Sequence, residues 1–222
     1  MNLTLFDLDG TLIPVDSDHS FGAFMVEVGW VDGEAWGRRN DEFFAQYNAG
    51  TLDLPAYVEF ATSAWRHRPL DEALAMRERF MAEIGKPALR PEAIALVERH
   101  RAAGDLIALV TATNEFVTAP FAEAFGIEHL IAVQLQRDDA GRYTGAIRGV
   151  PSFREGKIER VASWLQGLGA QWQGFERVTF YSDSTNDLPL LERVSHPVAT
   201  NPSPSLANIA NARGWPQLQL FA

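Results

Sequence analysis

The sequence predicts an α/β protein with a doubly wound, mostly parallel sheet and an α-helical unit inserted near its start. Beyond residue 90, short apolar runs alternate with amphipathic helical segments, the pattern typical of successive βαβ units. Residues 16–88 carry aromatic residues at helical spacing and no strand-like run. Acidic and hydroxyl residues follow several of the apolar runs, where parallel strands would end. These features predict a core domain of residues 1–15 and 89–222 and a helical cap domain of residues 16–88.

The first element is the apolar run Leu3-Thr4-Leu5-Phe6, which is bounded by Asp7-Leu8-Asp9-Gly10-Thr11. Its length indicates a buried strand, although periodicity alone does not distinguish a strand from a buried helix. The inserted unit follows, and its helical faces are marked by two sets of residues. They are Trp36, Phe43, Phe44 and Tyr47, and then Leu54, Tyr57, Val58, Ala61 and Trp65. We expect both sets to form the core of a small helical bundle.

The remaining elements alternate. Pro91 and Gly104 bracket a helix over residues 92–103. The predicted elements after it are a strand at 106–110, a helix at 115–125, a hairpin of residues 130–136 and 142–147, a helix near 158–168, and strands at 178–181 and 197–200.

Composition excludes several classes of protein. The chain has 222 residues, a net charge of −10 and no cysteine, so disulfides, thiolate chemistry and cysteine-based zinc sites are excluded. No basic stripe is present, which argues against nucleic acid and against an anionic membrane surface. No signal peptide or membrane-spanning run is recognisable, so we expect a cytoplasmic protein. Oligomeric state is not predictable from the sequence.

The residues that carry chemistry stand at the carboxyl ends of the proposed parallel strands. In open α/β sheets these ends face one crevice, where ligands bind. We expect that crevice to contain Asp7, Asp9, Thr111, Ala112, Asp183, Asn186 and Asp187, with Lys157 reaching it from the start of a helix. Carboxylate oxygens without His or Cys suit Mg²⁺. A hydroxyl, backbone N–H groups and a lysine suit a phosphoryl group. The set predicts metal-assisted hydrolysis of a phosphomonoester, for which an aspartate is a known nucleophile.

The order D-x-D-G-T, Thr111, Lys157 and S-D-S-T-N-D resembles the four motifs of the haloacid dehalogenase superfamily of phosphohydrolases. The resemblance covers essentially the whole chain and is specific to the phosphoserine-phosphatase-like branch, subfamily IB, which has a Rossmann-like core and a cap inserted after the first motif.

This resemblance implies a role for each matching position. Asp7 would be the nucleophile, and Asp9 the general acid and base. The implied Mg²⁺ ligands are Asp7, Asp9 through its backbone carbonyl, Asp183, and Asp187 directly or through water. The implied phosphate-binding residues are Thr111, Ala112, Lys157 and Asn186. Because Asp9 is a proton donor, the motif favours phosphatase chemistry over dehalogenation.

Substrate selection is expected to lie in the cap and in the segment that leads into it. Asp16 and Asp18 are the candidate specificity residues, either as partners of a substrate amine or only as caps of the first cap helix. Arg38 and Arg39 are candidate partners of a substrate carboxylate, although no motif assigns them. We expect a small amine-bearing phosphorylated metabolite of the phosphoserine or histidinol phosphate type.

Three alternatives remain at this stage. A phospho-acceptor receiver domain also uses an acidic pocket with a Thr and a Lys, but it needs neither Asp9 nor a large helical insert. A phosphotransferase of the same fold would pass the phosphoryl group to a second hydroxyl. A catalytically inactive binding protein is disfavoured by the intact pair Asp7 and Asp9.

Overall fold

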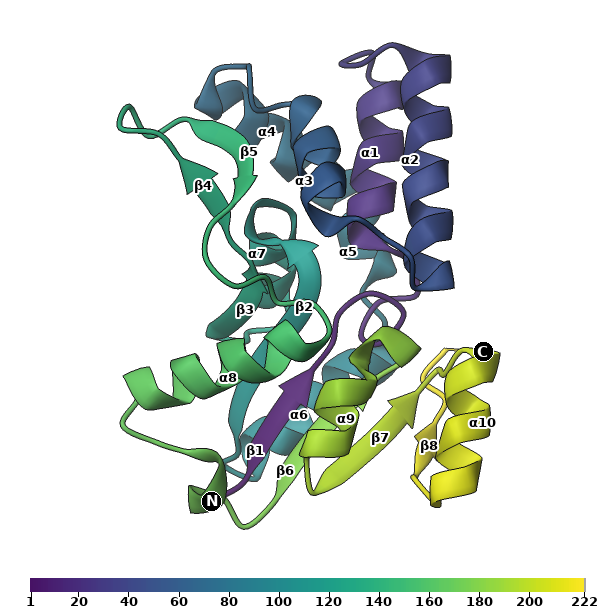
Figure 1. Ribbon diagram of the computed structural model, residues 1–222, viewed down its shortest axis with the longest axis vertical. Coiled ribbons are helices and arrows are strands. Elements are labelled where there is room, and N and C mark those ends of the chain that lie inside the picture. Colours follow the sequence, from purple (N-terminus) through teal and green to yellow (C-terminus); the bar gives the residue numbers. More distant parts are fainter. Residues whose placement is uncertain (222) are drawn as a thin grey trace.

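The computed structural model describes residues 1–221 and is built on one six-stranded sheet (Figure 1). All neighbouring strands in this sheet run parallel, so the predicted fold class is confirmed. In spatial order the strands are β3 (His129–Val133), β2 (Leu106–Asn114), β1 (Leu3–Phe6), β6 (Val178–Ser182), β7 (His196–Thr200) and β8 (Gln217–Leu218). The strand that precedes Asp7 therefore lies near the centre of the sheet.

Helices cover both faces of the sheet, as crossover connections between parallel strands require, so the strands are buried on both sides. Successive side chains of a strand point to opposite faces. Phe6 joins one core with helices α6 (Pro91–Ala102) and α7 (Glu115–Ala124). Leu5 joins the other, which is formed with α8 (Glu155–Gly167), α9 (Leu188–Arg193) and α10 (Pro204–Arg213). Short 3₁₀ turns at Trp172–Gly174 and Thr185–Asp187 complete the connections.

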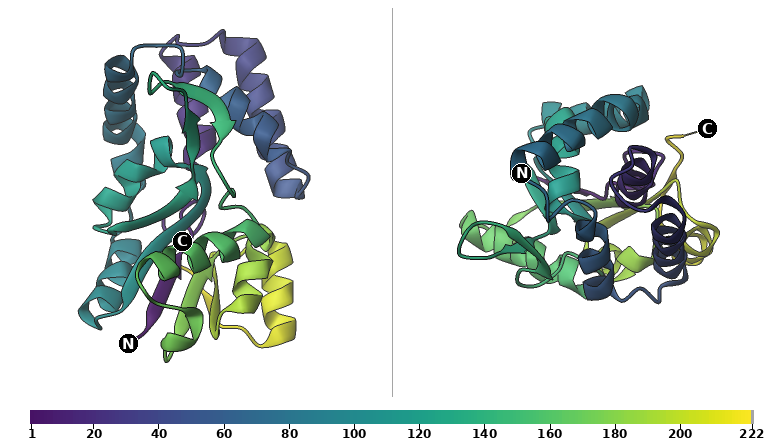
Figure 2. Two further views of the ribbon diagram at one scale, coloured as in Figure 1. Left: turned by 60° about the vertical axis from the view of Figure 1, so that its left-hand side comes forward. Right: turned by 90° about the horizontal axis from the view of Figure 1, so that it is seen from above.

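The inserted unit lies beyond the carboxyl ends of the strands (Figures 1 and 2). Its elements are α1 (Ser17–Glu27), α2 (Gly33–Ala49), α3 (Leu54–Ser63), α4 (Leu70–Phe80), a π-helical turn (Met81–Gly85) and α5 (Lys86–Ala88). Aromatic side chains hold these helices together. Phe43 packs against Tyr57 at a ring-centroid distance of 5.3 Å, and Trp36 stacks on Phe60 at 4.4 Å. The predicted bundle core is observed only in part: Val58 and Trp65 are buried in the core, whereas Phe44 and Tyr47 line a pocket.

One predicted element is wrong in part. We expected residues 130–136 to pair with residues 142–147, but residues 129–133 form β3 at the edge of the main sheet. Only β4 (Leu135–Arg137) pairs with β5 (Tyr143–Ile147). The apolar run splits because residues 129–133 pair in parallel with β2, which leaves only residues 135–137 to pair with β5. The remaining hairpin packs against α3 beside the cap (Figure 1).

Within residues 1–221, no helix combines the length and the apolar character that crossing a bilayer requires.

Candidate active site

The acidic motif begins where β1 ends. The Asp7 amide donates to the Tyr181 carbonyl at 3.0 Å, so it continues the pairing of β1 with β6. The chain then turns at Gly10, whose φ is +71°. A Cβ atom there would lie 2.4 Å from Asp183 Oδ2, so this position requires glycine for its conformation and for the close approach of Asp183. Asn201 fixes the turn by donating to the Gly10 carbonyl at 2.8 Å.

Lys157 links two of the predicted carboxylates. Its side chain is 1% exposed, and Nζ lies 2.9 Å from Asp7 Oδ1 and 2.8 Å from Asp187 Oδ2. Ser182 donates to the same Asp187 oxygen at 2.8 Å. Burial lowers the pKa of Lys157, but the charges of Asp187 and Asp7 outweigh burial and raise it, so the ammonium persists. The structure therefore brings Lys157 to Asp7, the predicted nucleophile, and Asp187 holds Lys157 there.

Buried Asp7 and partly buried Asp183 are two acids near a single cation, Lys157, which Asp7 shares with Asp187. Burial and the charge of Asp187 raise the pKa of Asp7 to about 7, although Lys157 opposes the shift. Burial and the charges of Asp7 and Asp187 raise the pKa of Asp183 well above its usual value. The Thr11 hydroxyl lies 3.5 Å from Asp7 Oδ2 and 3.3 Å from Asp183 Oδ1. A buried carboxylate without a partner is costly, so this pair fits a bound cation.

The donor set is one of hard oxygen atoms, which fits Mg²⁺. Among residues 1–221, no three Asp, Glu or His side chains converge closely enough to form a complete metal cluster. Mg²⁺ bound at Asp7 and Asp183 would therefore need a backbone carbonyl and water to complete its shell, which is usual for this ion.

Asp9 is held through both of its oxygens. The Ser17 amide donates to Oδ1 at 2.7 Å, and the Thr113 hydroxyl donates to Oδ2 at 2.9 Å. Burial and the neighbouring charge of Asp16 raise the pKa of Asp9 to about 7, while the hydrogen bonds from Ser17 and Thr113 limit the rise. A carboxyl of this pKa can both give and take a proton near neutral pH.

The stretch after the predicted strand 106–110 is not a loop. β2 continues to Asn114, and α7 begins at the next residue. Thr111 Oγ1 accepts from the Thr113 amide at 3.1 Å, and Asn114 Oδ1 caps α7 by accepting from two amides. Sequence reasoning missed Thr113 and Asn114. The signal that could have found them is a polar T-x-T-N run at a strand end followed by a helix.

Asn186 lies between the core and the cap. Its Nδ2 donates to the Tyr47 carbonyl at 3.0 Å, near the end of α2. Arg154 donates to the nearby Gly50 carbonyl, which ends the same helix. The amide group of Asn186 thus contacts the cap, whereas the resemblance implied a contact with phosphate.

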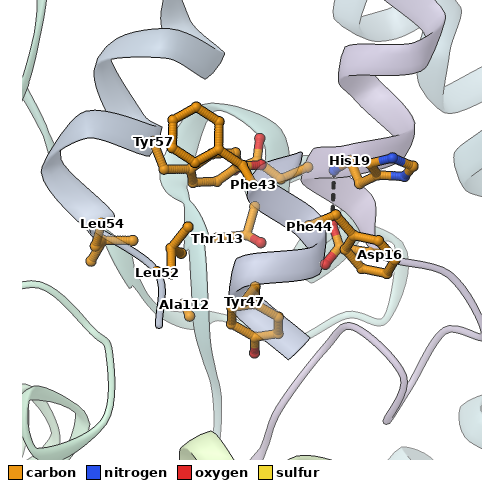
Figure 3. A pocket seen from close by; sticks show the side chains of 11 residues that line it. Asp16, His19, Phe43, Phe44, Tyr47, Leu52, Leu54, Tyr57, Ala112 and Thr113 are labelled. Carbon is orange, nitrogen blue, oxygen red and sulfur yellow. Dashed lines mark hydrogen bonds between the residues drawn. The ribbon is translucent and has the colours of Figure 1, made fainter. Parts of the chain in front are cut away.

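A pocket opens beside this site, between the cap and the end of β2 (Figure 3). Its free volume is about 30 Å³, the room that about two water molecules need. It is lined by Asp16, Asp18, His19, Phe43, Phe44, Tyr47, Leu52, Leu54, Tyr57, Ala112 and Thr113. Ala112 and Thr113 place it next to the predicted phosphate-binding segment.

Asp16 and Asp18 have different surroundings in this pocket. Asp16 caps α1 by accepting from the His19 amide at 2.7 Å, so the capping alternative holds for it. Asp18 is 6% exposed and accepts from Asn114 Nδ2 at 3.1 and 3.3 Å. Burial and the charge of Asp9 raise the pKa of Asp18 to about 7, against hydrogen bonds from Tyr57 and Asn114. Asp18 is thus a buried acid whose hydrogen-bond partners within residues 1–221 are neutral groups.

The two candidate arginines lie outside the pocket. Arg38 pairs with Glu34 at 3.7 Å on the surface of α2. Arg39 pairs with Glu42 at 2.7 Å and covers the outer face of the Phe43 ring. No Arg or Lys is among the described residues that line the pocket. The lining therefore offers a cation two acids and aromatic faces, and it suits a carboxylate poorly.

Comparison with known proteins agrees with this geometry. The family model of haloacid dehalogenase-like hydrolases matches residues 4–192. A histidinol-phosphatase of Neisseria meningitidis serogroup C is 41% identical over 217 residues, 98% of each chain. A Bordetella pertussis Tohama I protein of unknown function shares 49% identity over 99% of both chains, with a TM-score of 0.93. A substrate-bound phosphoserine phosphatase shares the fold at a TM-score of 0.68, with 17% identity over 97% of this chain and 91% of that one.

Proposed function

The chain belongs to the haloacid dehalogenase-like hydrolases and is a phosphatase, and from that premise we propose that it is a Mg²⁺-dependent histidinol phosphatase. The observation that carries the substrate assignment is the pocket beside Thr113, whose lining among the described residues includes two acids and four aromatic rings besides His19, and no arginine or lysine. The receiver-domain alternative is set aside, because the chain's relatives include phosphatases.

In the first step, a carboxylate oxygen of Asp7 attacks phosphorus and the bond from phosphorus to the leaving oxygen breaks. Protonated Asp9 gives its proton to that oxygen, which leaves as the alcohol. The product on the protein is an aspartyl-phosphate at Asp7. Lys157, 2.9 Å from the nucleophile, and the Thr111 hydroxyl bind phosphoryl oxygens and stabilise the charge that develops on them.

In the second step, ionised Asp9 takes a proton from water as the water oxygen attacks phosphorus. The bond between phosphorus and Asp7 breaks, which releases inorganic phosphate and restores both carboxyl groups. Asp7, the Asp9 carbonyl and Asp183 would hold Mg²⁺, with Asp187 contributing through water. When bound, the ion supplies positive charge beside the phosphoryl oxygens.

Histidinol phosphate suits the pocket because it carries an amine and an imidazole but no carboxylate. Asp18 offers a cation an acidic partner that is buried and hydrogen-bonded to the neutral side chain of Asn114. The rings of Phe43, Phe44 and Tyr57 offer faces for stacking and for cation–π contact. Phosphoserine carries a carboxylate, which in this pocket would face Asp16 and Asp18.

The direct test is release of phosphate from histidinol phosphate, phosphoserine and glycerol phosphate, with Mg²⁺ and with a chelator. We expect the highest kcat/KM for histidinol phosphate and loss of activity with the chelator. Asp7→Asn should abolish turnover in a protein that still folds. A preference for phosphoserine would contradict the substrate assignment, and an active Asp7→Asn variant would contradict the nucleophile. Transfer of phosphate to an added alcohol would indicate the phosphotransferase alternative.

A further inference from the structure

Thr113 contacts the general acid at the point where the substrate pocket meets the catalytic centre. Its side chain lines the pocket (Figure 3), and its hydroxyl donates to Asp9 Oδ2 at 2.9 Å. The residue is 7% exposed, so water competes little for this hydrogen bond. The other Asp9 oxygen accepts from the Ser17 amide at 2.7 Å. Thr113 is therefore the side chain that fixes the rotation of the Asp9 carboxyl about its χ2 angle.

Thr113 is itself held firmly. Its backbone amide donates to Thr111 Oγ1 at 3.1 Å, and the next residue, Asn114, caps α7 through its side chain. Threonine has a branched Cβ with few accessible χ1 rotamers, so the hydroxyl is directed with little loss of entropy. The contact joins β2 to the acidic motif after β1, across 104 residues of sequence.

We propose that Thr113 is a positioning residue that aims the Asp9 carboxyl at the leaving oxygen of the substrate. This inference deepens the proposed function and rests on the general-acid role of Asp9 given there. Thr113 neither gives nor receives the transferred proton. Its hydrogen bond to Oδ2, together with that of the Ser17 amide to Oδ1, holds the carboxyl in one orientation, so that the proton is presented in one direction.

The consequence is a dependence on the leaving group. An alkoxide such as that of histidinol needs its proton in the transition state, and general acids contribute about 10²–10⁴-fold to such steps. A nitrophenolate is stable without a proton and needs little help. Loss of a hydrogen bond to a charged group costs about 1.5–3 kcal/mol. Thr113→Val should therefore lower kcat/KM for histidinol phosphate roughly 10- to 100-fold more than kcat/KM for p-nitrophenyl phosphate.

The experiment compares kcat/KM for these two substrates in four variants of the full chain, because kcat/KM reports departure of the leaving group and not the later attack of water, in which Asp9 acts as base. Thr113→Val removes the hydroxyl and keeps the shape, and Thr113→Ser restores it. Asp9→Asn removes the acid and should give the same selective loss in stronger form. Thr200→Val is the matched control, because Thr200 is a fully buried strand threonine whose hydroxyl donates to the Val198 carbonyl. It should leave the ratio of the two rates unchanged.

The outcomes separate the inference from the function on which it rests. The role of Thr113 would be overturned by equal losses on both substrates in Thr113→Val, or by no recovery in Thr113→Ser. A selective loss in Asp9→Asn would still support the general-acid role of Asp9 in that case. If Asp9→Asn slows both substrates equally, the general-acid role fails and the inference fails with it. Should histidinol phosphate not be hydrolysed, the best alkyl phosphate of the panel replaces it, and the comparison keeps its meaning.

Discussion

Replacing Asp18 by asparagine should make the protein more stable and a poorer enzyme at the same time. Asp18 is buried, and the side chain that it contacts through both oxygens, Asn114, is neutral. Asparagine has nearly the same shape as aspartate and no charge. The variant therefore removes the cost of the buried charge together with the group that we expect to bind the substrate cation.

The magnitude follows from the pKa. Burial raises the pKa of Asp18 from 3.8 to about 7. Each pKa unit corresponds to about 1.4 kcal/mol, so the ionised side chain costs the folded state on the order of 4 kcal/mol above pH 7. The asparagine side chain of the variant would lose one of the two contacts with Asn114 Nδ2, and this loss reduces the gain in stability by about 1 kcal/mol. We expect a net gain of about 2–3 kcal/mol at pH 8.

The sign of the pH dependence is a further check. Because the folded pKa is the higher one, folded Asp18 holds its proton where the unfolded side chain has lost it. The wild-type protein is therefore penalised progressively as pH rises from about 4 to 7. The advantage of Asp18→Asn should shrink by about 2.6 kcal/mol between pH 8 and pH 5.

Urea unfolding at pH 8 and pH 5 measures this difference, and initial rates measure the second effect. Losing a charge-assisted contact should lower kcat/KM for histidinol phosphate roughly 10- to 100-fold and leave p-nitrophenyl phosphate unchanged. Asp53→Asn is the matched control, since Asp53 is exposed beside pocket residue Leu54 and asparagine also caps α3. A variant that is less stable at pH 8 and keeps its selectivity would refute the reasoning.

Three further outcomes are expected. Lys157→Met should lower the free energy of unfolding in urea by about 3–5 kcal/mol, because it leaves two buried carboxylates unpaired. Adding Asp187→Asn should recover part of this loss. A loss below about 1 kcal/mol would contradict the pairing. Gly10→Ala, whose Cβ would lie 2.4 Å from Asp183 Oδ2, should raise the Mg²⁺ concentration needed for half-maximal activity. Gly29→Ala, with a similar φ of +72° and open space around it, controls for backbone strain. Mg²⁺ should raise the melting temperature more at pH 8 than at pH 6, because protons compete for Asp183; equal shifts would exclude this competition.

The positions of the candidate site acids were predictable because the local pattern places them. Asp7 and Asp183 each follow a strand of the parallel sheet, β1 and β6, which lie side by side. Adjacent parallel strands put their carboxyl ends together, so sequence alone brings these acids to one crevice. The position of Lys157 was predictable from its place in the order of the motifs. Its contacts with Asp7 and Asp187 could be expected once these acids were placed in the same crevice.

The missed features depend on contacts between distant segments. β2 continues to Asn114 because its last residue aligns with Val133 of β3 after a shift of register, which no periodicity announces. The partner of Asn186 is a cap carbonyl 139 residues away. Asp18 looks like any acid at a helix start, and only the packing of the cap against the end of β2 buries it. Strand β8, with two residues, is too short to leave a pattern.

The net charge of −10 at first opposes an anionic substrate. The structure relieves this conflict, because Asp7, Asp9 and Asp18 each have a pKa of about 7 and so do not carry three full charges at neutral pH. A cation at Asp7 and a substrate cation at Asp18 would each displace a proton from its carboxyl and replace it as the neutralising charge. The same buried acids thus avoid repelling phosphate in the free protein and become binding charges when their partners arrive. Binding of histidinol phosphate should therefore release protons into a weakly buffered solution, and Asp18→Asn should reduce that release.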